Sequence, residues 1–251
     1  MEFRQLHPEP RTVDSADLYA DLGLNARAHE ERPWLVVNFA TTADGRVTID
    51  GRSGPIGDDG DTELFRRLRG QVDALLVGTG TLAAERYGPV SRRPEVRAAR
   101  EALGLVPEPP IVTLTRSGVL PEEIPLYDAA ESHLIVFTTP DAPEPPHAAA
   151  TITLIRLDPA ELTPTTVLRR LRAEHNIHSL LCEGGPTLFG ALLRERLVDE
   201  LFLTLAPQLA GGGTGPSLTE GAALAEPAGL RLEWVLERNA SMYLRYAVSS
   251  A

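Results

Sequence analysis

Short apolar runs recur along the chain, and within each run successive residues are apolar rather than every second one. Runs of this kind are typical of strands that are buried on both faces of a sheet. Helical patterns stand between several of them. The alternation predicts an α/β fold with a mostly parallel central sheet and helices on both faces. The expected strands are Trp34–Ala40, Val72–Val77, Ile111–Thr115, His133–Thr138, Thr151–Ile155, Ser179–Cys182 and Leu201–Ala206. The expected helices are Thr62–Arg69, Thr79–Glu85, Pro94–Leu103, Thr165–His175 and Pro186–Leu197.

The two ends of the chain depart from this alternation. Residues 1–32 are polar and contain several prolines, with one helical candidate around Asp14–Leu22, so they are predicted to form an N-terminal arm. Residues 33–251 are predicted to form the main domain. Near the C-terminus, Leu230–Glu237 and Met242–Val248 flank a short turn, which predicts an antiparallel hairpin.

Composition excludes several classes of function. The formal net charge of −11 argues against nucleic acid or an anionic membrane as a partner. All 24 basic residues are arginine, so phosphate loops and imine chemistry that depend on lysine are excluded. One cysteine, Cys182, leaves no disulfide and no multi-cysteine zinc site, and we expect no metal. No apolar leader or membrane span is visible, so a cytoplasmic protein is expected.

The first segment that could carry chemistry follows the strand Ser179–Cys182. Glu183 ends the strand, Gly184 and Gly185 turn the chain, and Pro186 begins a helix that continues through Thr187 and Leu188. Glycines let a ligand approach the backbone, and N–H groups at a helix N-terminus attract anions. A tight strand-to-helix turn without a ligand is the alternative. The acid at the carboxyl end of a strand, where α/β sheets bind ligands, favours a phosphate site.

The second segment is Gly78-Thr79-Gly80-Thr81-Leu82-Ala83, which follows the strand Val72–Val77 and matches the dinucleotide pattern G-x-G-x-x-A. A site for NADH would require an acid at the end of the next strand. That strand ends instead in Thr115-Arg116-Ser117, which suits the 2′-phosphate of NADPH. An ordinary polar loop is the alternative. The pattern therefore favours NADPH over NADH.

The third segment is the polar loop after the first strand. Asn38 and Ala40 belong to the end of that strand, the loop carries Asp44-Gly45, and Ser53 and Pro55 follow shortly after. By itself, Asp44-Gly45 is typical of a turn.

These segments occur together, in this order, in one family. The order is the Asp44-Gly45 loop, Gly51-x-Ser53, a helix ending in Arg69, Gly78-x-Gly80-Thr81, Glu183-Gly-Gly-Pro-Thr-Leu, Val198-Asp199-Glu200 and Ala206-Pro207-x-Leu209-x-Gly211. Over residues 33–248 the chain resembles the reductase domain of riboflavin biosynthesis, which has the dihydrofolate-reductase fold and in many bacteria is fused to a deaminase. The cysteines of a deaminase zinc site are absent. The resemblance identifies 33–251 as a reductase domain and implies a homodimer.

The resemblance also implies roles for individual residues. Asp44 and Glu183 would be the catalytic acids, with Glu183 binding the acceptor. Asn38, Ser53, Arg69 and Glu183 would bind the substrate. The cofactor NADPH would be bound by Ala40, Pro55, Thr81, Glu85, Thr115, Gly185, Pro186, Thr187 and Leu188. The glycine segments and the Arg116-Ser117 segment described above add Gly78, Gly80, Arg116, Ser117 and Gly184 to this set.

Two departures bear on the substrate. Asn38 stands where bacterial members of the family often have lysine. Archaeal-type members resemble this chain in having asparagine there. The family's acid-acid-Pro segment and its phosphate-binding arginine are replaced by Glu85-Arg86-Tyr87-Gly88-Pro89-Val90, a change shared with stand-alone actinobacterial members. The favoured function is NADPH-dependent reduction of 5-amino-6-(5-phosphoribosylamino)uracil or a related pyrimidine. The alternatives are reduction of dihydrofolate or another pterin-like acceptor, and NADPH binding without turnover.

Overall fold

The computed structural model describes residues 1–249 except 21 and 214. The chain forms two compact units, each assembled from separate stretches of sequence. The first unit comprises Met1–Gly23, Leu35–Leu68 and Pro186–Ala251. The second comprises Leu24–Trp34 and Arg69–Gly185.

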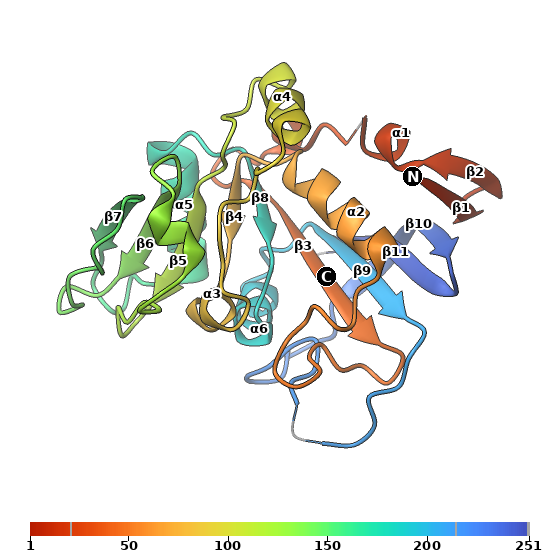
Figure 1. Cartoon of the computed structure of the whole chain (residues 1–251). Coiled ribbons are helices and arrows are strands. Elements are labelled where there is room, and N and C mark those ends of the chain that lie inside the picture. The colour runs from red at the N-terminus through yellow and green to blue at the C-terminus, as the bar shows by residue number, and fades with distance from the viewer. Residues whose placement is uncertain (21, 214, 250–251) are drawn as a thin grey trace. The chain divides into compact units, whose positions relative to one another are not determined.

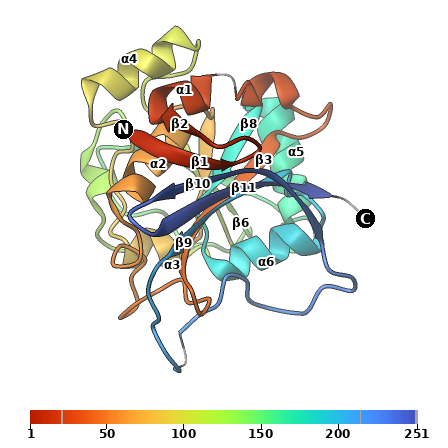
Figure 2. The same cartoon turned by 90° about the vertical axis from the view of Figure 1, so that its right-hand side faces the viewer.

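The first unit is built on mostly antiparallel strands in the order β2-β1-β10-β11-β9-β3. Within this set β3 and β9 run parallel, whereas the other neighbours are antiparallel. Figure 2 shows β1, β10 and β11 side by side. Asn239 and Ala240 have positive φ in the turn of the β10–β11 hairpin. The strands are β1 (Glu2–His7), β2 (Arg11–Asp14), β3 (Trp34–Thr42), β9 (Glu200–Ala206), β10 (Gly229–Arg238) and β11 (Ser241–Ser249).

Helices α1 (Ser15–Ala20), α2 (Asp59–Arg69) and α6 (Pro186–Arg194) accompany these strands. Helix α6 buries Phe189, whose ring stacks on Phe39 of β3 with centroids 5.4 Å apart. A Cβ at Gly190 would lie 2.2 Å from the carbonyl oxygen of Glu220, so glycine is required where that loop crosses the helix.

The second unit is a fully parallel sheet in the order β8-β4-β5-β6-β7. Figure 1 shows β5, β6 and β7 in green, lying side by side. Strands β4, β6 and β8 are almost entirely buried, as expected for parallel strands. The strands are β4 (Ala74–Leu76), β5 (Ile111–Thr115), β6 (His133–Thr138), β7 (Thr151–Arg156) and β8 (Ser179–Cys182). The helices are α3 (Thr79–Ala84), α4 (Pro94–Ala102) and α5 (Pro164–Glu174), with 3-10 turns η1 (Leu24–Arg27) and η2 (Pro125–Asp128).

The predicted fold class is confirmed: a mostly parallel sheet carries helices and an antiparallel C-terminal hairpin. Strands β1 and β2 were not predicted, because β1 pairs with β10 and that partner is more than 200 residues away. The helical candidate Asp14–Leu22 contains α1, and its residue 21 lies outside the described residues. The division into an N-terminal arm (1–32) and a reductase domain (33–251) stays a prediction.

Candidate functional site

In the second unit, three neighbouring parallel strands end in segments that were predicted to bind a ligand. Strand β8 leads into Glu183-Gly184-Gly185, β4 leads into Gly78, and β5 ends at Thr115, followed by Arg116 and Ser117. Ligands of α/β sheets bind at the carboxyl ends of such strands. The parallel order β8-β4-β5 therefore brings these three predicted segments to one edge of the sheet.

Two glycine turns pack directly against each other at this edge. The backbone N–H of Gly78 donates to the carbonyl oxygen of Gly184 over 2.8 Å. A Cβ at Gly78 would lie 3.3 Å from the nitrogen of Gly185, and a Cβ at Gly185 would lie 3.0 Å from Oγ1 of Thr81. Gly184 has a φ of +86°, which favours glycine. Backbone conformation therefore favours glycine at Gly184, and close packing leaves little room for a side chain at Gly78 and Gly185, whether or not a ligand is bound.

Helix α3 begins in this glycine packing. Gly78 is its N-cap and supplies no side chain to bond the first N–H groups of the helix. A Cβ at Gly80 would meet nothing within 4 Å, so the space beside that backbone is open to a ligand. Thr81 lies in the first turn, and Glu85 closes the helix at its C-cap. The N–H groups of Thr81 and Leu82 both donate to the carbonyl oxygen of Gly78, so what this turn offers a ligand is the open space beside Gly80 and the Thr81 hydroxyl.

The segment after β5 combines a guanidinium with hydroxyl groups. Oγ1 of Thr115 and Oγ of Ser117 are 3.2 Å apart, and Arg116 donates through Nη1 to the carbonyl oxygen of Pro159 over 3.1 Å. Arg116 and Ser117 are exposed. This arrangement leaves an arginine and two hydroxyls accessible at the sheet edge that also carries the glycine turns.

A buried acid and a partly exposed arginine form an ion pair in the same unit. Arg69 donates to both carboxylate oxygens of Glu183, from Nε over 2.7 Å and from Nη2 over 2.6 Å. The Glu183 side chain is 3% exposed, whereas that of Arg69 is 22% exposed. The geometry makes Glu183 the anchor of the pair, and Arg69 presents the larger surface to solvent.

Tyr87 completes this pair, although sequence reasoning did not assign it a role. Its hydroxyl accepts from Nη2 of Arg69 over 3.0 Å, and the Arg69 guanidinium carbon lies 5.7 Å from the centre of its ring. Tyr87 is 8% exposed. It lies in the segment where the chain departs from the family pattern, and that departure was the one available signal.

Arg100 is a second residue to which the sequence pattern assigned no role. It is fully buried on α4 and donates to three backbone carbonyls: Nη1 to Arg69 over 2.6 Å and to Val72 over 2.8 Å, and Nε to Val106 over 2.8 Å. Burial lowers the pKa of its guanidinium to about 10, so the group is charged at neutral pH. Its Nη2 has no hydrogen-bond partner in the part of the chain that the structure describes. Arg100 therefore fixes the backbone of the residue whose side chain holds Glu183.

In the first unit, Asp44 is held by a ring of hydrogen bonds. Oδ1 accepts from the hydroxyl of Thr42 over 2.5 Å and from the N–H of Ala210, and Oδ2 accepts from the N–H of Gly211 over 2.7 Å. The Thr42 hydroxyl, followed by these N–H groups, lowers the pKa of Asp44 to about 2. The carboxylate is therefore an acceptor that ties the loop after β9, and it has no proton to donate near neutral pH.

Replacing Asp44 by asparagine is expected to destabilise the fold at pH 6 to 7. Because the folded pKa lies below the ordinary value of 3.8, the stabilisation is fully present above that value and is lost as the pH falls through about 2. Urea unfolding from pH 7 down to pH 2 should show the wild-type and Asp44→Asn curves converging at the acid end. A difference that stays constant over this range would contradict the assignment.

The other predicted residues of the first unit lie on β3, in the loop after it, and at the start of α6. Asn38 and Ala40 are half-buried on β3, beside β9. Pro186, Thr187 and Leu188 form the first turn of α6. Ser53 and Pro55 are exposed in the loop before α2, where Gln208 donates to the carbonyl oxygen of Pro55. No contact described in this unit tests their predicted roles.

Three further findings concern other kinds of function. Cys182 is fully buried, and burial raises the pKa of its thiol to about 12, so it does not form a reactive thiolate. No group of three or more potential metal-ligating side chains is found among the residues described. Within the same residues, every helix is too short or too polar to span a bilayer.

Comparison with known proteins places these features in one family. Residues 33–240 match the family model described as the RibD C-terminal domain. A 2,5-diamino-6-ribosylamino-4(3H)-pyrimidinone 5′-phosphate reductase of Archaeoglobus fulgidus is 25% identical over 76% of this chain and 87% of its own length. The riboflavin biosynthesis protein RibD of Mycobacterium tuberculosis is 30% identical over 73% of this chain, but the match spans 46% of that longer protein.

Solved structures show the same fold. A pyrimidine reductase-like protein of Corynebacterium diphtheriae superposes with a TM-score of 0.74 and 23% identity, covering 95% of this chain and all of that one. The riboflavin biosynthesis reductase Rib7 of Saccharomyces cerevisiae superposes with a TM-score of 0.66 and 18% identity, covering 94% of this chain and all of that one.

Proposed function

Because the chain belongs to the RibD C-terminal domain family, we propose that it is an NADPH-dependent oxidoreductase that reduces the ribosyl group of a ribosylaminopyrimidine phosphate to ribityl. The proposal rests on the arrangement of segments at the carboxyl ends of the parallel strands of the second unit. There the glycine turns and the Thr115-Arg116-Ser117 segment follow neighbouring strands, and the Arg69–Glu183 pair adjoins one of the turns. The acceptor class is supported by the curated relatives that carry the name of a pyrimidinone phosphate reductase.

The residues of the second unit fit a phosphorylated dinucleotide. The open space beside Gly80 leaves room for a phosphate group, and the hydroxyls of Thr115 and Ser117 are accessible donors. Arg116 adds the guanidinium that a 2′-phosphate requires. When bound, NADPH supplies the hydride. The protein's task is to orient both reactants and exclude water.

In the proposed site Glu183 acts through Arg69. A carboxylate that is nearly closed off from solvent and engaged on both oxygens orients a guanidinium well, because the bidentate geometry fixes the plane of that group. Arg69 then binds an anionic or hydroxyl-bearing part of the acceptor. The roles of Asn38, Ala40, Asp44, Ser53, Pro55, Pro186, Thr187 and Leu188 remain predictions from the resemblance.

Purified protein should oxidise NADPH steadily when 5-amino-6-(5-phosphoribosylamino)uracil or its 2,5-diamino-pyrimidinone counterpart is supplied, as followed by NADPH absorbance. Dihydrofolate is the comparison acceptor. The segment that would bind the substrate phosphate in the family is replaced here, and Tyr87 of the replacing segment accepts a hydrogen bond from Arg69 instead. Turnover with dihydrofolate alone would reassign the substrate. Tight NADPH binding without oxidation by any of these acceptors would contradict the enzymatic proposal.

Replacing Arg116 by alanine is expected to weaken NADPH binding by about ten- to hundredfold, the effect of losing one charge-assisted contact. The affinity for NADH, which lacks the 2′-phosphate, should stay unchanged. Arg156→Ala is the matched control, because Arg156 ends β7 in the same sheet and pairs with Glu144. Fluorescence titration of both cofactors measures the effect, and an unchanged preference for NADPH would remove Arg116 from the site.

Further proposals concern the location, oligomeric state and partners of the whole protein. We expect a cytoplasmic homodimer with no nucleic-acid or membrane partner. Light scattering that gives the mass of a single 27.1 kDa chain would contradict the dimer.

A further inference from the structure

A pocket of about 410 Å³ lies within the first unit, among β1, β2, α1, β10 and β11. No residue that lines it belongs to the proposed reductase site. Its volume is in the range of pockets that accept small organic ligands. The chemistry of its lining therefore bears on what it could bind.

One side of the pocket is aromatic and apolar. Trp234 of β10 is 7% exposed, and its ring meets Phe202 edge-on with centroids 5.7 Å apart. Leu18 of α1 and Val13 of β2 line the same pocket. Because Phe202 packs against one part of the indole, the orientation of the ring is fixed, and the small exposed part of the indole gives the pocket a rigid aromatic wall.

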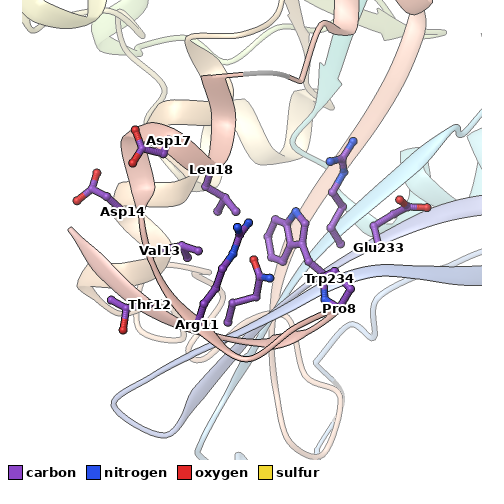
Figure 3. A pocket seen from close by; sticks show the side chains of 11 residues that line it. Pro8, Arg11, Thr12, Val13, Asp14, Asp17, Leu18, Glu233 and Trp234 are labelled. Atoms are coloured by element: carbon purple, nitrogen blue, oxygen red, sulfur yellow. The ribbon is translucent and has the colours of Figure 1, made fainter.

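Two arginines line the pocket, and their charges are compensated differently. Arg245 donates to both carboxylate oxygens of the buried Glu200, so its charge is balanced within the protein. The Arg11 side chain makes no hydrogen bond or ion pair with any other residue that the structure describes. Figure 3 shows the Arg11 guanidinium directed between Leu18 and Trp234. Arg11 is therefore an available cation beside the indole.

The acids around the pocket limit the charge of a ligand. Figure 3 shows the carboxylates of Asp14, Asp17 and Glu233 pointing away from the space between Arg11 and Trp234. Asp14 is paired with the N-terminal amine over 2.9 Å. Oε1 of Glu233 lies 2.6 Å from the guanidinium of Arg231, but it is buried and makes no hydrogen bond with a described residue. The three carboxylates therefore point away from the part of the pocket that Arg11 occupies. They would still repel a ligand with several negative charges, such as a nucleotide.

We propose that this pocket binds a planar aromatic monoanion, such as an aromatic carboxylate, with its ring against Trp234 and its acid group on Arg11. The exposed part of the indole supplies an aromatic contact, and the guanidinium supplies a bidentate contact that matches a carboxylate. Neither group takes part in the proposed reduction, so this site can be tested without reference to turnover.

The chain has two tryptophans, so its indole N–H groups give two cross-peaks in a proton–nitrogen correlation spectrum. A Trp34→Phe variant identifies the Trp234 peak. Titration with 2-naphthoate should shift that peak to saturation, whereas the uncharged 2-naphthamide should bind about ten- to hundredfold more weakly, because it lacks the charge-assisted contact. Arg11→Gln should reduce naphthoate affinity by a similar factor.

Arg4→Gln is the matched control, because Arg4 lies on the neighbouring strand β1 and pairs with Glu237 outside the pocket lining. Naphthoate affinity should be unchanged in this variant. The proposal is overturned if the Trp234 peak does not move. It is also overturned if naphthoate and naphthamide bind equally well, or if Arg11→Gln binds naphthoate as well as wild type, since the ring alone would then account for the contact.

Discussion

Arg69→Met is expected to destabilise the protein by about 3 to 5 kcal/mol, the usual cost of removing one partner of a buried ion pair. The side chain that remains, Glu183, is 3% exposed, and its carboxylate would lose both of its contacts with the guanidinium. Urea unfolding measures the change. Arg170→Met is the control: its pair with Glu174 lies on the surface of α5 and should contribute less than about 1 kcal/mol.

A second variant separates stability from function. In Arg69→Met/Glu183→Leu no buried charge is left without a partner, so most of the lost stability should return. Acceptor reduction should remain impaired in both variants if Arg69 binds the acceptor, while NADPH affinity should change little. A double variant that regains both stability and normal KM for the acceptor would show that the pair is structural. Tyr87→Phe, which removes a single hydrogen bond, should cost about 0.5 to 1.5 kcal/mol.

Arg100→Met is expected to cost about 3 kcal/mol or more. It would leave the buried carbonyls of Arg69, Val72 and Val106 without their donors, and each unsatisfied carbonyl costs about 1 to 3 kcal/mol. Arg93→Met at the N-cap of the same helix is the matched control. The side chains of Arg93 and its ion-pair partner Glu95 are both 64% exposed, so the loss should be small.

Arg100 is a positioning residue in this interpretation, because its fully buried side chain contacts the backbone of Arg69. In Arg100→Met protein that is still folded, KM for the acceptor should rise while KM for NADPH stays near the wild-type value. A parallel change in both constants, or a loss of kcat alone, would indicate general loosening of the fold and contradict the positioning role. The Arg93→Met control should change neither constant.

Local sequence patterns were sufficient to predict much of the fold. Buried parallel strands are apolar at successive positions. From this pattern the ends of β3, β5, β6 and β8 were predicted to within a few residues of the observed ends. The strand predicted at Val72–Val77 is shorter, Ala74–Leu76, and the helix predicted at Pro186–Leu197 ends at Arg194. Such ends depend on capping and packing, which a periodic pattern does not describe.

The N-terminal strands show where local patterns fail. Residues 1–14 are polar and proline-containing, yet β1 pairs with β10 and with β2. A polar strand can form because a distant strand supplies the partners for its backbone hydrogen bonds. The residues of the polar strand do not indicate which strand that is, so its pairing cannot be predicted from its own sequence. The pocket beside Trp234 has the same origin, since its lining comes from both ends of the chain.

By itself, the sequence determined the class of fold and the segments that carry chemistry, because strand and helix periods and glycine turns are local properties. The glycines at Gly78, Gly184 and Gly185 could be recognised from sequence, whereas their contact across two strands could not. Tertiary structure decided which charges are buried. Arg69 and Glu183 meet across 114 residues, and Arg100 is buried on a helix whose Arg97 remains partly exposed. Burial and pairing depend on long-range packing, so the same residue type stabilises the interior at one position and contacts water at another.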